Sequence, residues 1–278
     1  GYFGVVRPLR ARGLAVTVLP SVSAVQRAAA LARRPWDDLT VVDARGRGFR
    51  YAVNVCRARR SVGVLTAPGA GPAELAAALV GWRRDIVVVE DPGTEDERLS
   101  IVDLSAASTR TWRHPNVVLC LVDSDVVGAE SWLAGGGPLP PEDGWALAED
   151  AFAHRDGVVT GPSPRALALA KLAPRPGALL WDVAAGSGAL GVEAARLGAA
   201  VIAVESDPGL CVRIVANASA FGVDVRLVEG AAPDALAGLP RPDSVFVGDP
   251  SPEVVRACAG AGAARVVVAV DELSGVDP

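Results

Sequence analysis

Apolar residues recur along the chain at two spacings, one typical of strands and one typical of helices. In the first half, β-branched runs predict strands at residues 14–20, 39–44, 61–67, 85–91, 98–104 and 116–122. Residues 22–34 and 71–84 are rich in alanine and repeat apolar positions at helical spacing, so they predict helices. Strands that alternate with helices indicate an α/β domain with a largely parallel sheet.

Residues 134–144 interrupt this pattern, because AGGGPLPPEDG is rich in glycine and proline and has no periodic apolar face. A second α/β pattern follows. Its predicted strands are 179–184, 200–205, 223–229, 244–248 and 265–271, and its predicted helices are 164–172, one ending near 197, 208–221 and 252–260. We therefore predict a first domain at 1–133, a linker at 134–147 and a second domain at 148–278. We expect the two domains to fold independently.

The first strand of the second domain leads into a glycine-rich loop, in the segment WDVAAGSGALG. Gly186, Gly188 and Gly191 are spaced as G-x-G-x-x-G, which lets the backbone turn sharply and exposes helix N–H groups to a ligand. Glu205 ends the next predicted strand, where a carboxylate accepts hydrogen bonds from a ribose. This arrangement is typical both of NAD-binding proteins and of methyltransferases that use S-adenosylmethionine (SAM).

Asp182 favours SAM over NAD. A carboxylate four residues before Gly186 would repel a pyrophosphate, whereas it attracts the ammonium and the sulfonium of SAM. Two nearby polar residues have simpler roles. Asp207 before Pro208 predicts a helix N-cap. Asn217 falls on an apolar helix face and predicts a buried amide that bonds to neighbouring backbone.

Composition narrows the classes of partner. The net charge is −5 and the isoelectric point is near 5.2, which argues against nucleic acid or an anionic membrane as the main partner. No apolar run approaches the ~20 residues of a membrane span. The 4 cysteines and 2 histidines are scattered, so we expect no metal site and no disulfide framework, and a cytoplasmic location.

Longer segments resemble known families. The second domain resembles the decarboxylating methyltransferase component of cobalamin biosynthesis over DGVVTGPSPRALALAKLAPRPGALLWDVAAGSGALGVEAARLGAAVIAVESDP, FGVDVRLVEGAAPDAL and PDSVFVGD. The first domain resembles the tetrapyrrole methylases over GYFG, LPSVSAVQRAAALARRPWDD, VLTAPGAGPAELAAAL, VEDPGTEDER and HPNVVL. The order of the two domains resembles the family of decarboxylating precorrin-6Y C(5,15)-methyltransferases.

The resemblance implies a tetrapyrrole methylase α/β domain followed by a Rossmann-like class I SAM-dependent methyltransferase domain. It implies methylation of precorrin-6Y at meso carbons 5 and 15, with decarboxylation of the ring C acetate. Together with Asp182, the expected SAM-binding residues are Thr160, Ala184, Ala185, Gly186, Ser187, Gly188, Glu205 and Ala232. The substrate would be a polycarboxylate tetrapyrrole, for which Arg165, Arg45 and Arg47 are candidate contacts. We also expect a homo-oligomer.

Several positions depart from the family pattern. Ala184 stands where the family has glycine, which is tolerable only if its φ is negative. Gly161 replaces a lysine and Ala231 replaces an acid. We expect the chain to be truncated at both ends relative to the family. A nicotinamide-dependent oxidoreductase and a degenerate, non-catalytic SAM-binding fragment are the alternatives.

No catalytic residue is assigned from the sequence. Methyl transfer from SAM needs positioning more than acid–base help, and the conjugated macrocycle can accept the electrons released on decarboxylation. His154 and Asp156 are the nearest candidates for proton carriers, and we interpret them as an ordinary loop pair.

Overall fold

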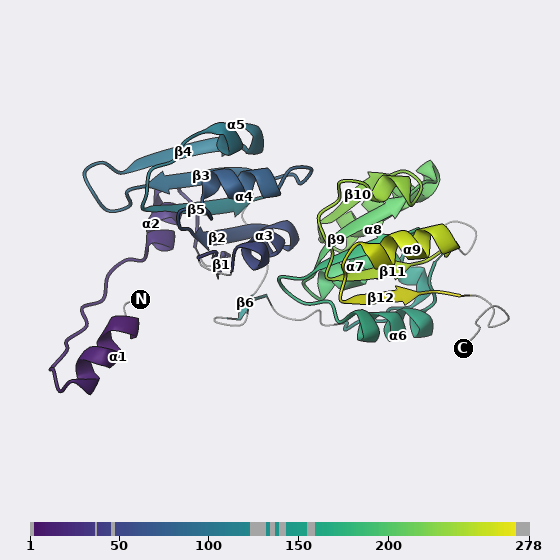
Figure 1. Cartoon of the computed structure of the whole chain (residues 1–278), viewed down its shortest axis with the longest axis horizontal. Coiled ribbons are helices and arrows are strands. Elements are labelled where there is room, and N and C mark those ends of the chain that lie inside the picture. Colours follow the sequence, from purple (N-terminus) through teal and green to yellow (C-terminus); the bar gives the residue numbers. More distant parts are fainter. Residues whose placement is uncertain are drawn as a thin grey trace.

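The computed structural model describes residues 3–36, 38–45, 48–122, 132–133, 137–138, 143–154 and 159–270. Up to residue 138 the elements are α1 (Phe3–Ala11), α2 (Ala24–Leu31), β1 (Thr40–Asp43), α3 (Phe49–Ala58), β2 (Ser61–Leu65), α4 (Pro72–Ala78), β3 (Asp85–Glu90), β4 (Arg98–Asp103), α5 (Leu104–Thr109), β5 (Asn116–Leu121), β6 (Trp132–Leu133) and β7 (Gly137–Pro138). From residue 143 they are η2 (Glu149–Ala151), α6 (Pro162–Leu172), β8 (Leu179–Val183), α7 (Ala189–Arg196), β9 (Ala200–Glu205), α8 (Pro208–Ala220), β10 (Val225–Glu229), η3 (Asp234–Leu236), β11 (Ser244–Val247), α9 (Pro252–Gly260) and β12 (Arg265–Val268). Two five-stranded sheets lie side by side, and β6 pairs with β7 (Figure 1).

The first sheet has the order β1-β2-β5-β3-β4. Its β1–β2 pair is parallel, and the pairs β2–β5, β5–β3 and β3–β4 are antiparallel. The prediction of a largely parallel sheet is therefore wrong for the first domain. The connection from β3 to β4 is a short turn, and a turn of that length can only return the chain antiparallel. Helices α3, α4 and α5 pack on one face of this sheet, and α2 packs on the other.

The second sheet has the order β10-β9-β8-β11-β12, and all its strand pairs are parallel. Helices α6, α7 and α8 cover one face and α9 lies on the other, which confirms the Rossmann-like fold of the second domain. The chain order reverses beside β8, the central strand. In open α/β sheets ligands bind at the carboxyl ends of the strands next to such a reversal.

The structure of the first domain departs from the predictions in four local elements. Residues 14–20 form no strand; they are extended and mostly exposed, with Leu19 82% exposed, because no sheet edge lies beside them. Helices α1, α3 and α5 were not predicted. Helix α3 was missed although its apolar residues repeat at helical spacing; its polar residues Arg50, Asn54 and Arg57 share the other face, and the structure nevertheless buries Ala52 to Arg57 without a break.

Half of the predicted linker, 134–147, lies outside the described residues, and its role as a domain boundary stays a prediction. Within the described part of the chain, no helix is long and apolar enough to cross a membrane.

Candidate cofactor site

The segment Ala184–Gly188 connects the central strand β8 to helix α7. Its backbone is left-handed at Ala184 (φ 55°), Gly186 (φ 60°) and Gly188 (φ 78°). The negative φ expected at Ala184 is therefore wrong. A Cβ at Gly248, just after β11, would lie 2.5 Å from the carbonyl oxygen of Ala184, so the neighbouring strand end holds the loop in this turn. An L-residue in this region costs about 1–2 kcal/mol.

Asp182 lies beneath the loop, near the end of β8. Its Oδ2 accepts a hydrogen bond from Gly191 N at 2.9 Å, and a Cβ at Gly191 would lie only 2.8 Å from that oxygen. Gly191 thus allows α7 to pack closely on β8. The Asp182 side chain is fully buried, and this burial raises its pKa to about 7. In this conformation Asp182 supports the loop, and its contact with a ligand ammonium stays a prediction.

Glu205 lies at the carboxyl end of β9, the strand next to β8. Its carboxylate accepts hydrogen bonds from Gly186 N at 2.8 Å, from Ser206 N at 2.8 Å and from Asp207 N at 2.9 Å. The residue is 7% exposed. The structure therefore brings together the glycine loop and the acid that the sequence placed nineteen residues apart. A carboxylate has about four acceptor positions, which leaves capacity for a further donor.

Ala232 follows β10, the next strand along the sheet, so it lies at the same edge as Glu205. Gly230 N donates to the Glu205 carbonyl oxygen at 2.8 Å and ties the two strand ends together. The loop after β8, the end of β9 and the loop after β10 thus form one continuous edge. This edge carries most of the residues expected to bind SAM.

Thr160 precedes α6 and is linked to the site through Arg165. The Arg165 guanidinium donates to the carbonyl oxygens of Thr160 and Leu147, and its Nε donates to Glu193 Oε1 on α7 at 3.0 Å. Arg165 and Glu193 are both fully buried. Arg165 as a substrate contact is therefore wrong, because its donors are used inside the protein and none of it reaches solvent.

Of the other candidate arginines and the loop pair, the structure describes Arg45 and His154. Arg45 pairs with Asp43 at 2.6 Å on the surface of the first domain. Arg47 and Asp156 lie outside the described residues, and His154 is exposed. His154 follows Ala153, whose backbone bonds to Asn217.

Both simple roles predicted near the loop are confirmed. Asp207 caps α8, accepting from Gly209 N and Leu210 N at 2.7 and 3.0 Å. Asn217 is buried and bonds only to backbone: its Oδ1 accepts from Ala153 N at 2.8 Å, and its Nδ2 donates to the oxygens of Ala153 and Ser187 at 3.0 and 2.8 Å. Asn217 thereby joins the segment before α6 to the glycine loop.

A family model described as "Precorrin methyltransferase domain" matches residues 150–271. This match contains the whole second sheet and every part of the site just described. These residues belong to the precorrin methyltransferase family. The precorrin methyltransferase domain is thus the unit that carries the glycine loop.

Curated relatives extend the similarity into the first domain. The chain is 35% identical over 251 residues to a precorrin-6Y C(5,15)-methyltransferase [decarboxylating] of Sinorhizobium sp, covering 88% of this chain and 58% of that protein. It is 36% identical over 250 residues to the protein of that name from Mycobacterium tuberculosis (strain CDC 1551 / Oshkosh), covering 87% of this chain and 60% of that protein. The chain therefore spans less than two thirds of the length of these relatives. A solved structure of the C-terminal domain of precorrin-6Y C5,15-methyltransferase from Rhodobacter capsulatus is 39% identical, with a TM-score of 0.42, over 44% of this chain and 69% of that chain.

One structural residue of the precorrin methyltransferase domain, Glu193, was missed from the sequence. Glu193 accepts from Ala146 N at 2.7 Å and from Leu147 N at 2.8 Å, in addition to Arg165. A single acid within the otherwise apolar stretch ALGVEAA was the available signal. Ser187 was expected at the cofactor site, but its burial was not; its Oγ has no hydrogen-bond partner among the described residues. Burial of a hydroxyl in a loop leaves no periodic trace in sequence.

Proposed function

We propose that this chain is a decarboxylating precorrin-6Y C(5,15)-methyltransferase that uses SAM in cobalamin biosynthesis. It would methylate precorrin-6Y at meso carbons 5 and 15 and remove carbon dioxide from the ring C acetate. The observation that carries the proposal is the glycine loop hydrogen-bonded to Glu205 at the carboxyl ends of β8 and β9. The names of the curated relatives, at 35 and 36% identity, support the choice of substrate.

The residues present fit SAM. Two buried polar atoms at the loop, Asp182 Oδ1 and Ser187 Oγ, have no partner among the described residues and are available to a ligand or to water. Glu205 would accept hydrogen bonds from the ribose hydroxyls, and the loop from Ala184 to Gly188 would hold the methionine part. Ala232 would border the adenine, and Thr160 would close the site from the α6 side.

SAM supplies an electrophilic methyl group when bound, and the chain supplies geometry. Glu205 and the loop fix the donor relative to the sheet, which turns methyl transfer into an oriented reaction between neighbours. Asn217 and the Arg165–Glu193 pair hold the segments on either side of the loop, which limits access of water. No residue is assigned as acid or base, because neither step requires one. We also propose a cytoplasmic homo-oligomer, to be tested by light scattering.

Calorimetry with S-adenosylhomocysteine and with NAD tests the cofactor. Glu205→Gln keeps the shape of the side chain and removes its charge, which should weaken S-adenosylhomocysteine binding by about tenfold, since charged acceptors exceed neutral ones by roughly 1–1.5 kcal/mol. Glu229→Gln is the matched control, because Glu229 is exposed and pairs in register with Glu205. Equal affinities of wild type and Glu205→Gln would remove Glu205 from the site. Tighter binding of NAD would favour the oxidoreductase.

Turnover separates the enzyme from a non-catalytic SAM-binding protein. With precorrin-6Y and methyl-labelled SAM, the proposal requires labelled tetrapyrrole and released carbon dioxide in the same reaction. Binding of S-adenosylhomocysteine without either product would show that the site binds and does not catalyse.

A further inference from the structure

Helix α3 lies between the two sheets. Its residues Ala52, Val53 and Cys56 pack into the core of the first domain, whereas Ala58 packs against the second sheet. Asn54, on the same helix, is fully buried and donates from Nδ2 to the carbonyl oxygen of Gly177 at 2.9 Å, across to the second domain. Residues Ala52 to Arg57 of α3 are buried without a break, and both domains contribute to covering them.

The turn before β3 adds an apolar anchor and an ion pair. Trp82 is buried in the core cluster of the second sheet, together with Leu179 and Trp181. Arg84 has a fully buried side chain; it donates to the carbonyl oxygens of Cys56 and Arg57 at 2.6 Å and to Asp224 Oδ2 at 2.5 Å. A central aromatic anchor beside a desolvated arginine is typical of the residues that dominate binding at interfaces.

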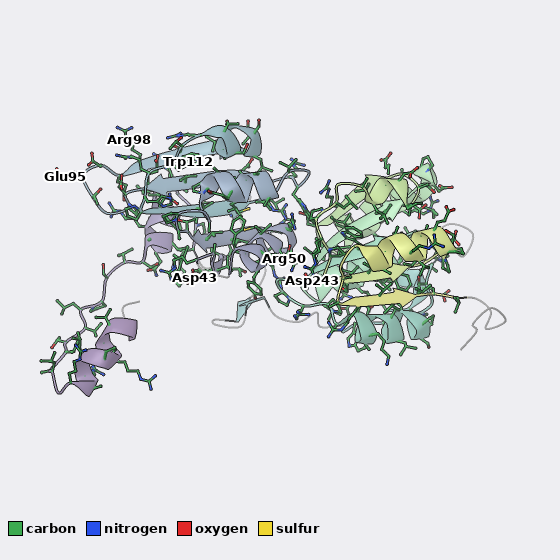
Figure 2. The ribbon with its side chains drawn as sticks, viewed as in Figure 1. Asp43, Arg50, Glu95, Arg98, Trp112 and Asp243 are labelled. Atoms are coloured by element: carbon green, nitrogen blue, oxygen red, sulfur yellow. The ribbon has the colours of Figure 1, made fainter. Side chains whose placement is uncertain are left out.

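A second ion pair borders this interface. Arg50 donates to both carboxylate oxygens of Asp243, at 2.7 and 3.0 Å, and to the carbonyl oxygen of Arg241 at 3.0 Å. Figure 2 shows Arg50 and Asp243 meeting between the two sheets. Gly177 permits close approach at the same border, because a Cβ there would lie 2.1 Å from the Tyr51 ring.

All these contacts fall at one end of the second sheet. Gly177, Asp224 and Asp243 immediately precede strands β8, β10 and β11, so the first domain contacts the amino ends of the parallel strands. The glycine loop and Glu205 lie at the carboxyl ends. A five-residue strand such as β8 separates the two ends by about 15 Å.

The first domain likewise contacts its neighbour with one end and carries its polar cluster at the other end. Its contacts come from α3 and from the turn that precedes the amino end of β3. Its polar cluster lies at the opposite end, where β2 and β3 finish. There Thr66 Oγ1 donates to Asn116, and Gly71 lies beside the His114 ring.

We propose that the two domains are joined back to back through α3 and the Trp82–Arg84 turn, as a stable non-covalent pair whose polar strand ends open away from each other. The first domain then acts as the missing cover of the second sheet, and the covalent linker is not needed to hold the pair together. This consequence rests on the proposed function: a tetrapyrrole processed at the glycine loop must leave that site before the other domain can act on it.

The association is tested on the full chain with a protease site introduced at 139–142. After cleavage, the two fragments should co-elute at micromolar concentration, and S-adenosylhomocysteine affinity should stay within about twofold. Arg84→Ala should weaken the association of the cleaved fragments by at least about tenfold, whereas Arg83→Ala, at the exposed neighbour, should not. If Arg84→Ala fails to fold, Arg50→Ala replaces it as the test. The Arg50 side chain is half-exposed, so its removal should leave both domains folded and still weaken the association of the fragments.

Fragments that separate on cleavage, or an Arg50→Ala variant that associates as tightly as wild type, would overturn the interface. During turnover, a singly processed tetrapyrrole should accumulate in protein-free filtrate before the final product. Complete conversion with no such species would overturn the separation of the sites. Absence of any product would instead contradict the proposed function and leave the association result standing.

Discussion

Replacing Ala184 by glycine is expected to stabilise the protein. Ala184 has a φ of 55°, in the left-handed region, and its carbonyl oxygen lies against Gly248, so the loop cannot relax to a negative φ without moving that strand end. The surrounding structure imposes the left-handed conformation, and the methyl group of Ala184 is the part of the residue that makes this conformation sterically unfavourable. Removing this methyl group leaves every hydrogen bond of the loop in place.

The magnitude follows from two opposing effects. Relief of the left-handed conformation contributes about 1–2 kcal/mol, and the greater freedom of glycine in the unfolded chain opposes it by about 0.5–1 kcal/mol. The net gain is about 0.5–1 kcal/mol, which raises the melting temperature by about 1–4 °C for a chain of this size. Because glycine keeps the same turn, S-adenosylhomocysteine affinity should change by less than about threefold.

Two matched variants separate strain from a general effect of glycine. Ala173→Gly changes another left-handed alanine (φ 50°), at the end of α6, and should also stabilise. Ala185→Gly changes the next residue, which is outside the left-handed region, and should destabilise by about 0.5–1 kcal/mol. Urea unfolding followed by tryptophan fluorescence measures all three. If Ala184→Gly and Ala185→Gly shift stability in the same direction, the account of the loop in terms of strain is refuted.

Three further substitutions test the supports of the loop. Burial raises the Asp182 pKa to about 7, so the native state keeps a proton that the unfolded state loses near pH 4. As the pH rises from 4 to 7, the free energy of unfolding should therefore fall by up to about 1.4 kcal/mol per pH unit. Asp182→Asn should flatten this slope in melting curves. Asn217→Ala leaves backbone groups of Ala153 and Ser187 without their partner and should cost about 1–3 kcal/mol in urea unfolding, against less than about 0.5 for the exposed Ser219→Ala. Arg165→Met should cost about 3–5 kcal/mol, because it strands the buried charge of Glu193; a loss below 1 kcal/mol would contradict the burial of that pair.

The sequence alone determined most of the second domain. Its strands are short β-branched runs separated by turn residues, and each appears in the structure within a few residues of its predicted position. The spacing of the glycine loop and the Asp207 cap are also encoded locally, and the burial of Asn217 follows from its place on an apolar helix face. These features could be predicted because local spacing is sufficient to specify them.

The tertiary structure decided which partners each residue meets. Residues 14–20 have the composition of a strand and form none, because a strand needs a neighbour to satisfy its backbone. Arg165 was a candidate contact for a polycarboxylate, but in the structure it pairs with the buried Glu193 of α7. The polar residue Asn54 of α3 is buried because the second domain covers it, and its partner Gly177 lies more than a hundred residues away in sequence. Such contacts depend on how distant segments fold together, and periodicity in one segment carries no information about the segment that will cover it.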